Sequence, residues 1–157
     1  MLNYFNSFKK NAFRVETLQR YDVSEEQYAY DYFLLNKKLP EWSCYEWINI
    51  IKQAKERWAT MQRVHLIQFP ISQYVSFELE EYKNNIKAWE EIFYMPFEKC
   101  SINIETDFWI FDDTIVLKMN YDKDGAFLNF EEVKDIGPYL EIKKYLLKNK
   151  KDIKDLF

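Results

Sequence analysis

The stretch Arg63–Pro70 reads RVHLIQFP, and its apolar side chains alternate with polar ones in the manner of a β-strand that ends at a proline. Residues 71–88 return to the three- and four-residue apolar spacing of a helix, for which Ser72 is the expected N-cap. Residues 91–95 then predict a second strand, which ends at Pro96. A strand, a helix and a strand in this order predict a right-handed crossover between two parallel strands.

The sequence after this unit predicts an antiparallel meander and a final helix. Short runs rich in aromatic and β-branched residues indicate three strands, at 108–111, 114–121 and 126–130. The segment Asp122–Gly125 is the expected hairpin turn, in which glycine supplies the positive φ. A helix should begin after Gly137-Pro138 and occupy the range 134–157.

The first 60 residues are predicted to be helical. A first helix, ending near Tyr21, is indicated by apolar residues at three- and four-residue spacing: Phe5, Phe8, Ala12, Val15 and Leu18. A second helix, from about Glu25 to Leu35, should start with a capping box formed by Ser24 and Gln27. A third helix is expected over residues 47–58.

These elements together predict an α+β fold. An N-terminal helical layer packs on a mixed sheet, made of one βαβ unit followed by an antiparallel meander, and a C-terminal helix completes it. With 157 residues, the chain has the length of one domain. We therefore expect a single domain over 1–157, with a helical layer (1–60), a sheet with its crossover helix (61–131) and a C-terminal helix (134–157).

Composition excludes several classes of protein. Aromatic residues make up 19% of the chain and charged residues 31%, which is typical of a globular protein and not of a disordered one. No apolar run approaches the ~18 residues of a membrane span, and the N-terminal residues lack a signal-peptide pattern, so we expect a cytoplasmic protein with no membrane contact. Cys44 and Cys100 stand outside any CxxC motif, which indicates reduced thiols.

Five aspartates fall at predicted strand ends and turns: Asp107, Asp112, Asp113, Asp122 and Asp124. Carboxylates gathered at one rim of a sheet are suitable ligands for Mg²⁺, which suggests a metal-dependent phosphodiesterase or nuclease that uses Asp107, Asp112, Asp113 and Glu78. Aspartate also favours turns, because its side chain hydrogen-bonds nearby backbone groups. We favour this structural interpretation and expect no metal and no cofactor.

His65 is the only histidine, and it lies between apolar neighbours in a predicted strand. With one histidine and no GxSxG sequence, a Ser–His–Asp triad has no support. A pair with Cys44 or Cys100 remains open, but a packed strand residue is the simpler interpretation. The absence of a specific catalytic motif favours a non-enzymatic protein.

Arg14 and Glu16 are expected to flank the apolar face of the first helix. They are candidates to anchor a partner, or to form a buried ion pair with Arg63, Glu78 or an aspartate of the segment 107–113. The second interpretation, an internal polar network that joins the helical layer to the sheet, is the one we favour.

Aromatic and basic residues offer two further possibilities. Tyr74, Trp109 and Tyr121 are candidates to stack on a ligand, although most aromatic residues lie at core spacing. The tail 143–157 carries six lysines and favours, at most, a weak contact with nucleic acid. A solvated helix end is the alternative interpretation of the tail.

Several segments together resemble a small bacterial family of unknown function whose members are best known from actinobacteria. The segments are FRVETL (13–18), PEW (40–42), SQY (72–74) and, as the most specific, DFWIFDD (107–113) with Met119, Tyr121 and Gly125 after it. The resemblance covers nearly the whole chain and implies a stand-alone domain associated with neighbouring helix-turn-helix regulators and antitoxin-like proteins. It implies no catalytic residues. Where relatives tend to read Gly-Glu, this chain has Trp89-Glu90, which puts a glycine-dependent turn in question.

The leading hypothesis is a non-enzymatic accessory or regulatory domain, antitoxin- or immunity-like, that binds a protein such as a helix-turn-helix regulator or a toxin through an acidic and aromatic surface. Its candidate binding residues are Arg14, Glu16, Arg63, Tyr74, Glu78, Asp107, Trp109, Asp112, Asp113 and Tyr121. Two alternatives stay open. One is the metal-dependent phosphodiesterase or nuclease, and the other is a small-ligand sensor, for a nucleotide for example, with its pocket between the N-terminal helices and the sheet.

Overall fold

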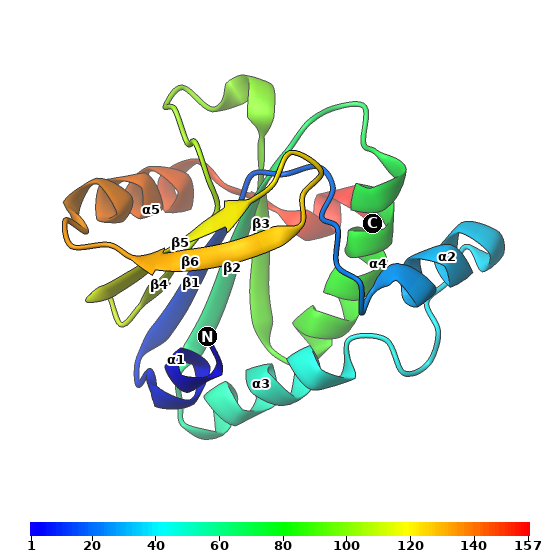
Figure 1. The fold of residues 1–157 in the computed structure, drawn as a ribbon, viewed down its shortest axis with the longest axis horizontal. Helices are drawn as coiled ribbons and strands as arrows, with labels where there is room; N and C mark the ends of the chain where they lie inside the picture. The colour runs from blue at the N-terminus through cyan, green and yellow to red at the C-terminus, as the bar shows by residue number, and fades with distance from the viewer.

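A seven-stranded mixed sheet with the order β6-β5-β4-β1-β2-β3-β7 forms the centre of the molecule (Figure 1). The computed structural model describes all 157 residues. Its strands are β1 (Asn11–Glu16), β2 (Thr60–Ile67), β3 (Glu90–Pro96), β4 (Phe108–Phe111), β5 (Ile115–Tyr121), β6 (Phe127–Glu132) and β7 (Lys151–Asp152). Strands β1, β2 and β3 are parallel, and the other pairings are antiparallel. The predicted α+β class is confirmed.

The unit β2-α4-β3 forms as the sequence predicts. Helix α4 (Gln73–Lys87) begins where the hydroxyl of Ser72 accepts a hydrogen bond from the backbone N–H of Val75 (3.0 Å). Strands β2 and β3 then pair in parallel from Met61 opposite Glu90 onwards. The predicted crossover connection is therefore confirmed.

The predicted meander is also confirmed in β4, β5 and β6. Its last turn needs Gly125, which has a φ of 90°. A Cβ atom at this position would lie 2.7 Å from the carbonyl oxygen of Arg20, so the turn packs directly against the segment before helix α2 (Gln27–Asn36).

The prediction that the first 60 residues are helical is wrong for residues 8–21. Helix α1 (Leu2–Ser7) is short, and the next element is β1, the strand at the middle of the sheet. Phe13, Arg14, Val15 and Glu16 alternate between apolar and polar residues, as in a strand, and both faces of β1 are buried, the polar one included. The apolar residues from Phe5 to Leu18 also fall at helical spacing, and residue 60 is not a boundary between a helical layer and the sheet.

The second and third predicted helices are present as α2 and α3 (Tyr45–Glu56). The predicted capping box is wrong, because α2 has no side-chain cap and the hydroxyl of Ser24 instead donates to Glu25 (2.9 Å). The C-terminal helix α5 (Gly137–Asn149) is shorter than predicted. It ends before Lys150. Two residues of the lysine-rich tail 143–157 then form β7 at the edge of the sheet, where Lys151 pairs with Tyr94.

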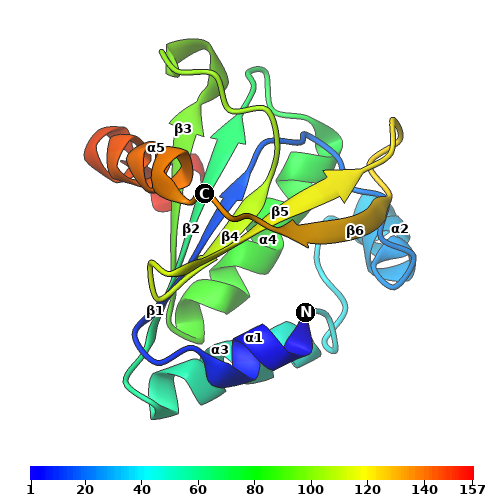
Figure 2. The same ribbon diagram turned by 60° about the vertical axis from the view of Figure 1, so that its left-hand side comes forward.

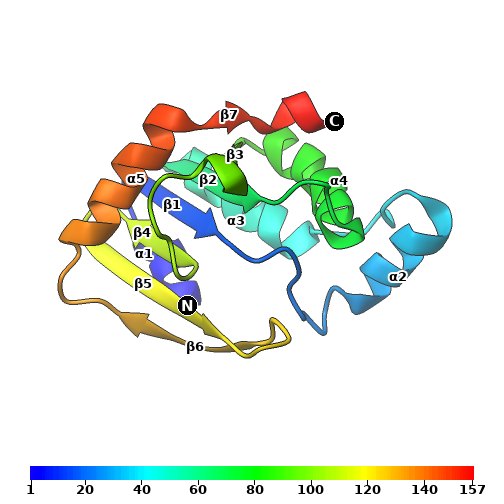
Figure 3. The same cartoon turned by 90° about the horizontal axis from the view of Figure 1, so that it is seen from above.

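Two helical layers cover the two faces of the sheet (Figures 2 and 3). Helix α5 packs on one face, where Phe13 and Val15 of β1 join its Leu146. Helices α1 and α3 pack on the other face, with α4 beside them, and α2 packs on α4. None of the helices combines the length and the hydropathy that crossing a membrane requires.

Candidate functional site

A polar cluster lies on the sheet face that α1, α3 and α4 cover. Alternation along β1 points Phe13 and Val15 towards α5 and leaves Arg14 and Glu16 on the opposite face. In the strand register, Arg14 pairs with Arg63 of β2, and Glu16 pairs with His65. The prediction that Arg14 and Glu16 lie on a helix is wrong, but the predicted association of these residues with Arg63 is present.

Glu16 is the centre of this cluster. Its Oε1 accepts from Nε of Arg14 (2.8 Å) and Nη1 of Arg63 (3.1 Å), and its Oε2 accepts from Nη1 of Arg63 (3.1 Å) and the hydroxyl of Tyr82 (2.9 Å). Burial acts to raise the pKa of Glu16, but Arg63 and Arg14 outweigh it and hold the pKa at about 2. Glu16 is therefore a permanent anion, and its four hydrogen-bonding positions are filled.

Each arginine is also bound by a second carboxylate. Arg63 donates from Nε to Glu90 of β3 (3.0 Å), which also accepts from Nε1 of Trp47 (2.9 Å). Arg14 donates from Nη2 to Asp107 (3.4 Å) and to the hydroxyl of Tyr121 (3.3 Å). The two guanidinium groups are thus neutralised beneath the helices.

Asp107 joins the end of β1 to the start of β4. Its Oδ1 accepts from the backbone N–H (2.8 Å) and the hydroxyl (2.7 Å) of Thr17, and its Oδ2 accepts from the hydroxyl of Tyr21 (2.6 Å). The residue is 1% exposed. Asp107 is therefore buried, and its hydrogen bonds hold the segment between β1 and α2 against the start of β4.

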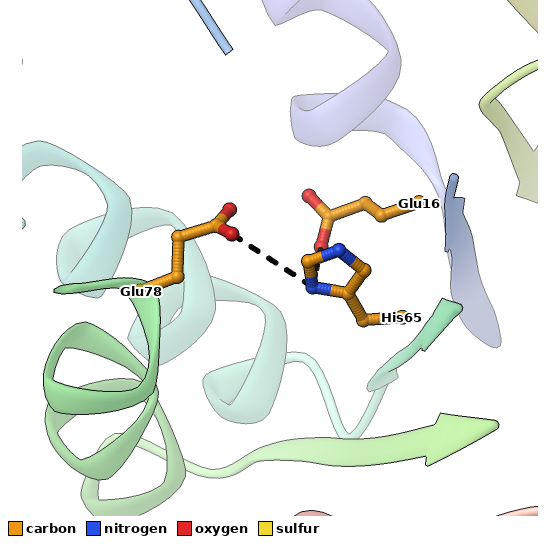
Figure 4. A group of neighbouring side chains, drawn as sticks. All are labelled: Glu16, His65 and Glu78. Atoms are coloured by element: carbon orange, nitrogen blue, oxygen red, sulfur yellow. Dashed lines mark ion pairs between the residues drawn. The ribbon is translucent and has the colours of Figure 1, made fainter. Parts of the chain in front are cut away.

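Glu78 of α4 points towards His65 and Glu16 (Figure 4). The Nε2 atom of His65 lies 2.9 Å from the carbonyl oxygen of Leu18, and its Nδ1 atom lies 3.0 Å from the hydroxyl of Tyr82. Burial lowers the pKa of His65, and its Nε2–H donates to the carbonyl oxygen of Leu18. The carboxylate of Glu78 lies 3.9 Å from Nδ1, too far for a hydrogen bond.

The ligand atoms of Glu16, His65 and Glu78 lie within 4.8 Å of one another, which raises the question of a metal ion. Glu16 does not suit this role, because all four of its hydrogen-bonding positions are already occupied. The guanidinium of Arg63 would also lie beside the ion and repel it. The residues therefore do not fit a metal centre.

A cavity of about 360 Å³ opens above the cluster, between the sheet and the helices. Helix α4 contributes one continuous face to its wall, at spacings of three and four residues: Tyr74, Glu78, Glu81, Tyr82 and Asn85. The sheet contributes Arg14, Glu16, Arg63, Trp109, Met119 and Tyr121, and the segments that cover it add Phe5 of α1, Trp42 of the turn before α3 and Trp47 of α3 among others. The cavity therefore has an aromatic wall and a charged floor.

Three buried polar atoms on this wall have no hydrogen-bond partner in the protein: Oε2 of Glu78, Oδ1 of Asn85 and Nε1 of Trp109. Their residues are 6%, 3% and 2% exposed. Folded proteins leave few such atoms, because each costs about 1–3 kcal/mol. Burial and the nearby Glu16 also raise the pKa of Glu78 well above its ordinary value.

The predicted aspartate cluster does not form. Asp112 and Asp113 follow the far end of β4, five and six residues from Asp107, and five residues span about 16 Å along an extended strand. Asp112 accepts from the backbone N–H groups of Lys9, Lys10 and Asn11, and Asp113 pairs with Lys143. Neither faces Arg14 or Arg63. Asp122 accepts from backbone groups of its own turn, as the structural interpretation of these aspartates predicts.

Of the ten predicted binding residues, eight line the cavity or bond to its wall: Arg14, Glu16, Arg63, Tyr74, Glu78, Asp107, Trp109 and Tyr121. Asp112 and Asp113 lie elsewhere. Sequence reasoning missed Tyr82, Glu90 and Asn85. A signal for Asn85 was present, because it falls seven residues after Glu78 and so on the same face of the helix.

A family model described as a domain of unknown function (DUF6879) matches residues 1–148. The chain belongs to this family. Searches of the curated proteins and of the solved structures found no match. The cavity of this DUF6879 domain lies wholly within the matched range, since its lining extends from Met1 to Phe127. Strand β7 lies outside that range.

Proposed function

We propose that this DUF6879 domain is a non-enzymatic ligand-binding domain that holds a small organic molecule in the cavity between α4 and the sheet. One observation carries the proposal: three buried polar atoms without a partner in the protein lie on the wall of the same cavity. A ligand that bonds to them would recover the free energy lost by burying them.

The size and composition of the cavity also support this function. Ligand pockets are typically ~300–1,000 Å³, mostly apolar, with a few convergent polar groups, and the cavity of about 360 Å³ fits this description. The network of Glu16, Arg14 and Arg63 holds the floor rigid. The two arginines of the floor are already paired with carboxylates, so they are not free to stabilise a negative charge that develops on a substrate, which favours binding over catalysis.

The test is a ligand screen that observes the indole of Trp109 directly. The five tryptophan indole N–H groups are assigned in ¹H–¹⁵N spectra with single Trp→Phe variants, and a fragment library of cationic, neutral and anionic compounds is added. We expect hits that move the Trp109 signal and leave that of the exposed Trp58 in place. If no compound moves the Trp109 signal, the proposed function is wrong.

A second candidate function, the binding of a protein partner, has its own support at another place. Trp58 and Trp89 follow the last residues of α3 and α4, and both have positive φ (60° and 86°). This position usually holds glycine, so a tryptophan there is strained. The glycine-dependent turn expected at Trp89 thus forms without glycine. Trp58 is 94% exposed and Trp89 is 64% exposed.

These two tryptophans begin neighbouring parallel strands, and exposed lysines accompany them at the same edge: Lys9, Lys10, Lys55 and Lys87. An aromatic and basic edge fits an acidic protein surface. A helix-turn-helix regulator or a toxin, which the family resemblance implies, would be bound at this edge and not at the buried residues first named for it. An antitoxin- or immunity-like role would follow from such binding.

Purification from the host under low salt tests this second function. We expect one stoichiometric partner with an acidic patch, and we expect Trp58→Ala with Trp89→Ala, or high salt, to release it. Glu78→Gln is the matched control and should leave the partner bound. Recovery of the bare chain, or a partner retained by the double variant, would contradict this second function.

A further inference from the structure

The charges on the cavity wall do not balance. Its two cations, Arg14 and Arg63, are already bound by three carboxylates of the floor: Glu16, Glu90 and Asp107. Burial lowers the pKa of His65, the remaining basic residue near the floor, and so disfavours a positive charge on it. No positive charge is left over for the acidic residues higher on the wall.

Three such acidic residues, Glu26, Glu78 and Glu81, have no arginine or lysine partner, and only His65, 3.9 Å from Glu78, lies near one of them. Glu26 accepts only from the hydroxyl of Tyr74 (3.0 Å), and Glu81 accepts from the hydroxyl of Ser43 (2.9 Å). Glu78 accepts no hydrogen bond in the protein. Burial, and after it the repulsion of neighbouring carboxylates, raises the pKa of all three carboxyls, and a positive charge placed beside them would favour their ionised forms.

The aromatic part of the wall suits a cation as well. Aromatic rings attract cations to their faces, and the effect is larger where water is excluded. The rings that line the cavity include Tyr21, Trp42, Trp47, Tyr74, Tyr82 and Tyr121. Carboxylates together with aromatic faces therefore favour the binding of an organic cation.

The spacing of the unpartnered atoms indicates how such a ligand would lie. Trp109 pairs with Arg14 in the register, and His65, which Glu78 faces, pairs with Glu16. These positions are two residues apart along the sheet and lie on the two strands that flank β1, so about 7 Å along the strands and about 10 Å across them separate the two backbones. The indole N–H of Trp109 is a donor, so the end of the ligand far from Glu78 needs an acceptor.

We propose that the ligand is a primary amine whose ammonium group binds at Glu78 and whose far end carries a hydroxyl or a similar acceptor for Trp109. This inference rests on the proposed function and specifies its ligand class. The ammonium donates to Oε2 of Glu78, and a hydroxyl at the far end accepts from Nε1 of Trp109.

The experiment uses four probes of similar size: tyramine, its alcohol analogue tyrosol, its acid analogue 4-hydroxyphenylacetate, and phenethylamine, which lacks the hydroxyl. Dissociation constants are measured at pH 7 by calorimetry on the full chain. We expect tyramine to bind at least tenfold more tightly than tyrosol, the acid not to bind, and phenethylamine to bind more weakly than tyramine.

Two variants locate the ammonium group. Glu78→Gln should remove the preference for tyramine over tyrosol, whereas Glu80→Gln, on the same helix and paired with Lys83, should leave it unchanged. Circular dichroism confirms that both variants fold. Equal binding of tyrosol or of the acid would overturn the inference while leaving the proposed function in place. Binding by none of the four probes would also overturn it, and the Trp109 screen decides the proposed function separately.

Discussion

Four hydrogen bonds from Arg14, Arg63 and Tyr82 end on the carboxylate of Glu16. Glu16→Gln leaves two buried guanidinium groups short of a counter-charge, so we expect the free energy of unfolding to fall by about 3–5 kcal/mol in urea denaturation. The exposed Glu56 is the control, and Glu56→Gln should stay within ~0.5 kcal/mol of the wild type. A loss below ~1 kcal/mol for Glu16→Gln would show that the network is not structural.

Glu26 makes stability depend on pH in the opposite sense to Glu16. Burial and the nearby Glu81 raise the pKa of Glu26 from 4.5 to about 7. The folded carboxyl thus holds its proton more tightly than the unfolded one, and the stabilisation present below pH 4.5 is lost as the pH rises through 7. We expect the free energy of unfolding to fall less between pH 5 and pH 8 in Glu26→Gln than in the wild type. An equal fall in both proteins would refute the shifted pKa.

The β4–β5 hairpin fixes the connection between α1 and β1. Asp112, at its turn, accepts backbone N–H groups of Lys9, Lys10 and Asn11. Asp112→Ala removes their acceptor and should cost about 1–3 kcal/mol in thermal or urea unfolding. Asp113→Ala removes only a partly exposed pair with Lys143 and should cost less than ~1 kcal/mol. If ligand binding is lost in either variant, Asp112 or Asp113 has a role that its position does not explain.

The ends of α3 and α4 carry strain that the fold itself does not need. Trp58, almost fully exposed at a φ of 60°, occupies a position where glycine costs nothing. We expect Trp58→Gly to raise the free energy of unfolding by up to ~1 kcal/mol, because relief of the left-handed strain exceeds the loss of an exposed ring. Trp58→Ala, which keeps a Cβ, should not stabilise. A destabilised Trp58→Gly would mean that Trp58 supports the fold and not a partner.

In the elements that the sequence predicts well, the apolar residues follow a single spacing, either helical or alternating. Helix α4 and the strands β2, β3, β4 and β5 show helical or alternating spacing over their length, and each is present near its predicted bounds. Strand β1 shows two periods at once, because residues 13–16 alternate while the apolar residues from Phe5 to Leu18 fall at helical spacing, and its Arg14 and Glu16 stand on a buried face. Their partners come from β2, β5, α4 and Asp107, the residue before β4, and such long-range pairing leaves no local pattern in the sequence.

The candidate site shows the same limit. Arg14, Glu16, Arg63 and Glu78 were recognised as possible partners from their types, but nothing local separates Asp107, which is buried, from Asp112, a turn residue at the other end of β4. The cavity itself depends on how α4 lies across the sheet. Only the folded chain brings the unpartnered atoms of Glu78, Asn85 and Trp109 to one wall.

Across the whole molecule, the structural network on the sheet is distinct from the proposed ligand site above it. Glu16 belongs to the network, and Glu78, which lies on the facing helix, belongs to the site. Residues of a binding site are often not optimal for stability, because their bonds are completed only by the ligand. Removing the charge of Glu78 should therefore raise the free energy of unfolding of the ligand-free protein. Removing the charge of Glu16 should lower it.

The most direct test is the free energy of unfolding of Glu78→Gln at pH 8, without ligand, against wild type and Glu80→Gln. We predict that Glu78→Gln is more stable than the wild type, by about 1 kcal/mol or more, because a buried carboxylate with no partner is replaced by a neutral amide. Glu80→Gln should match the wild type within ~0.5 kcal/mol. A clear loss of stability in Glu78→Gln would mean that Glu78 holds the fold together, and would contradict the assignment of the cavity as a ligand site.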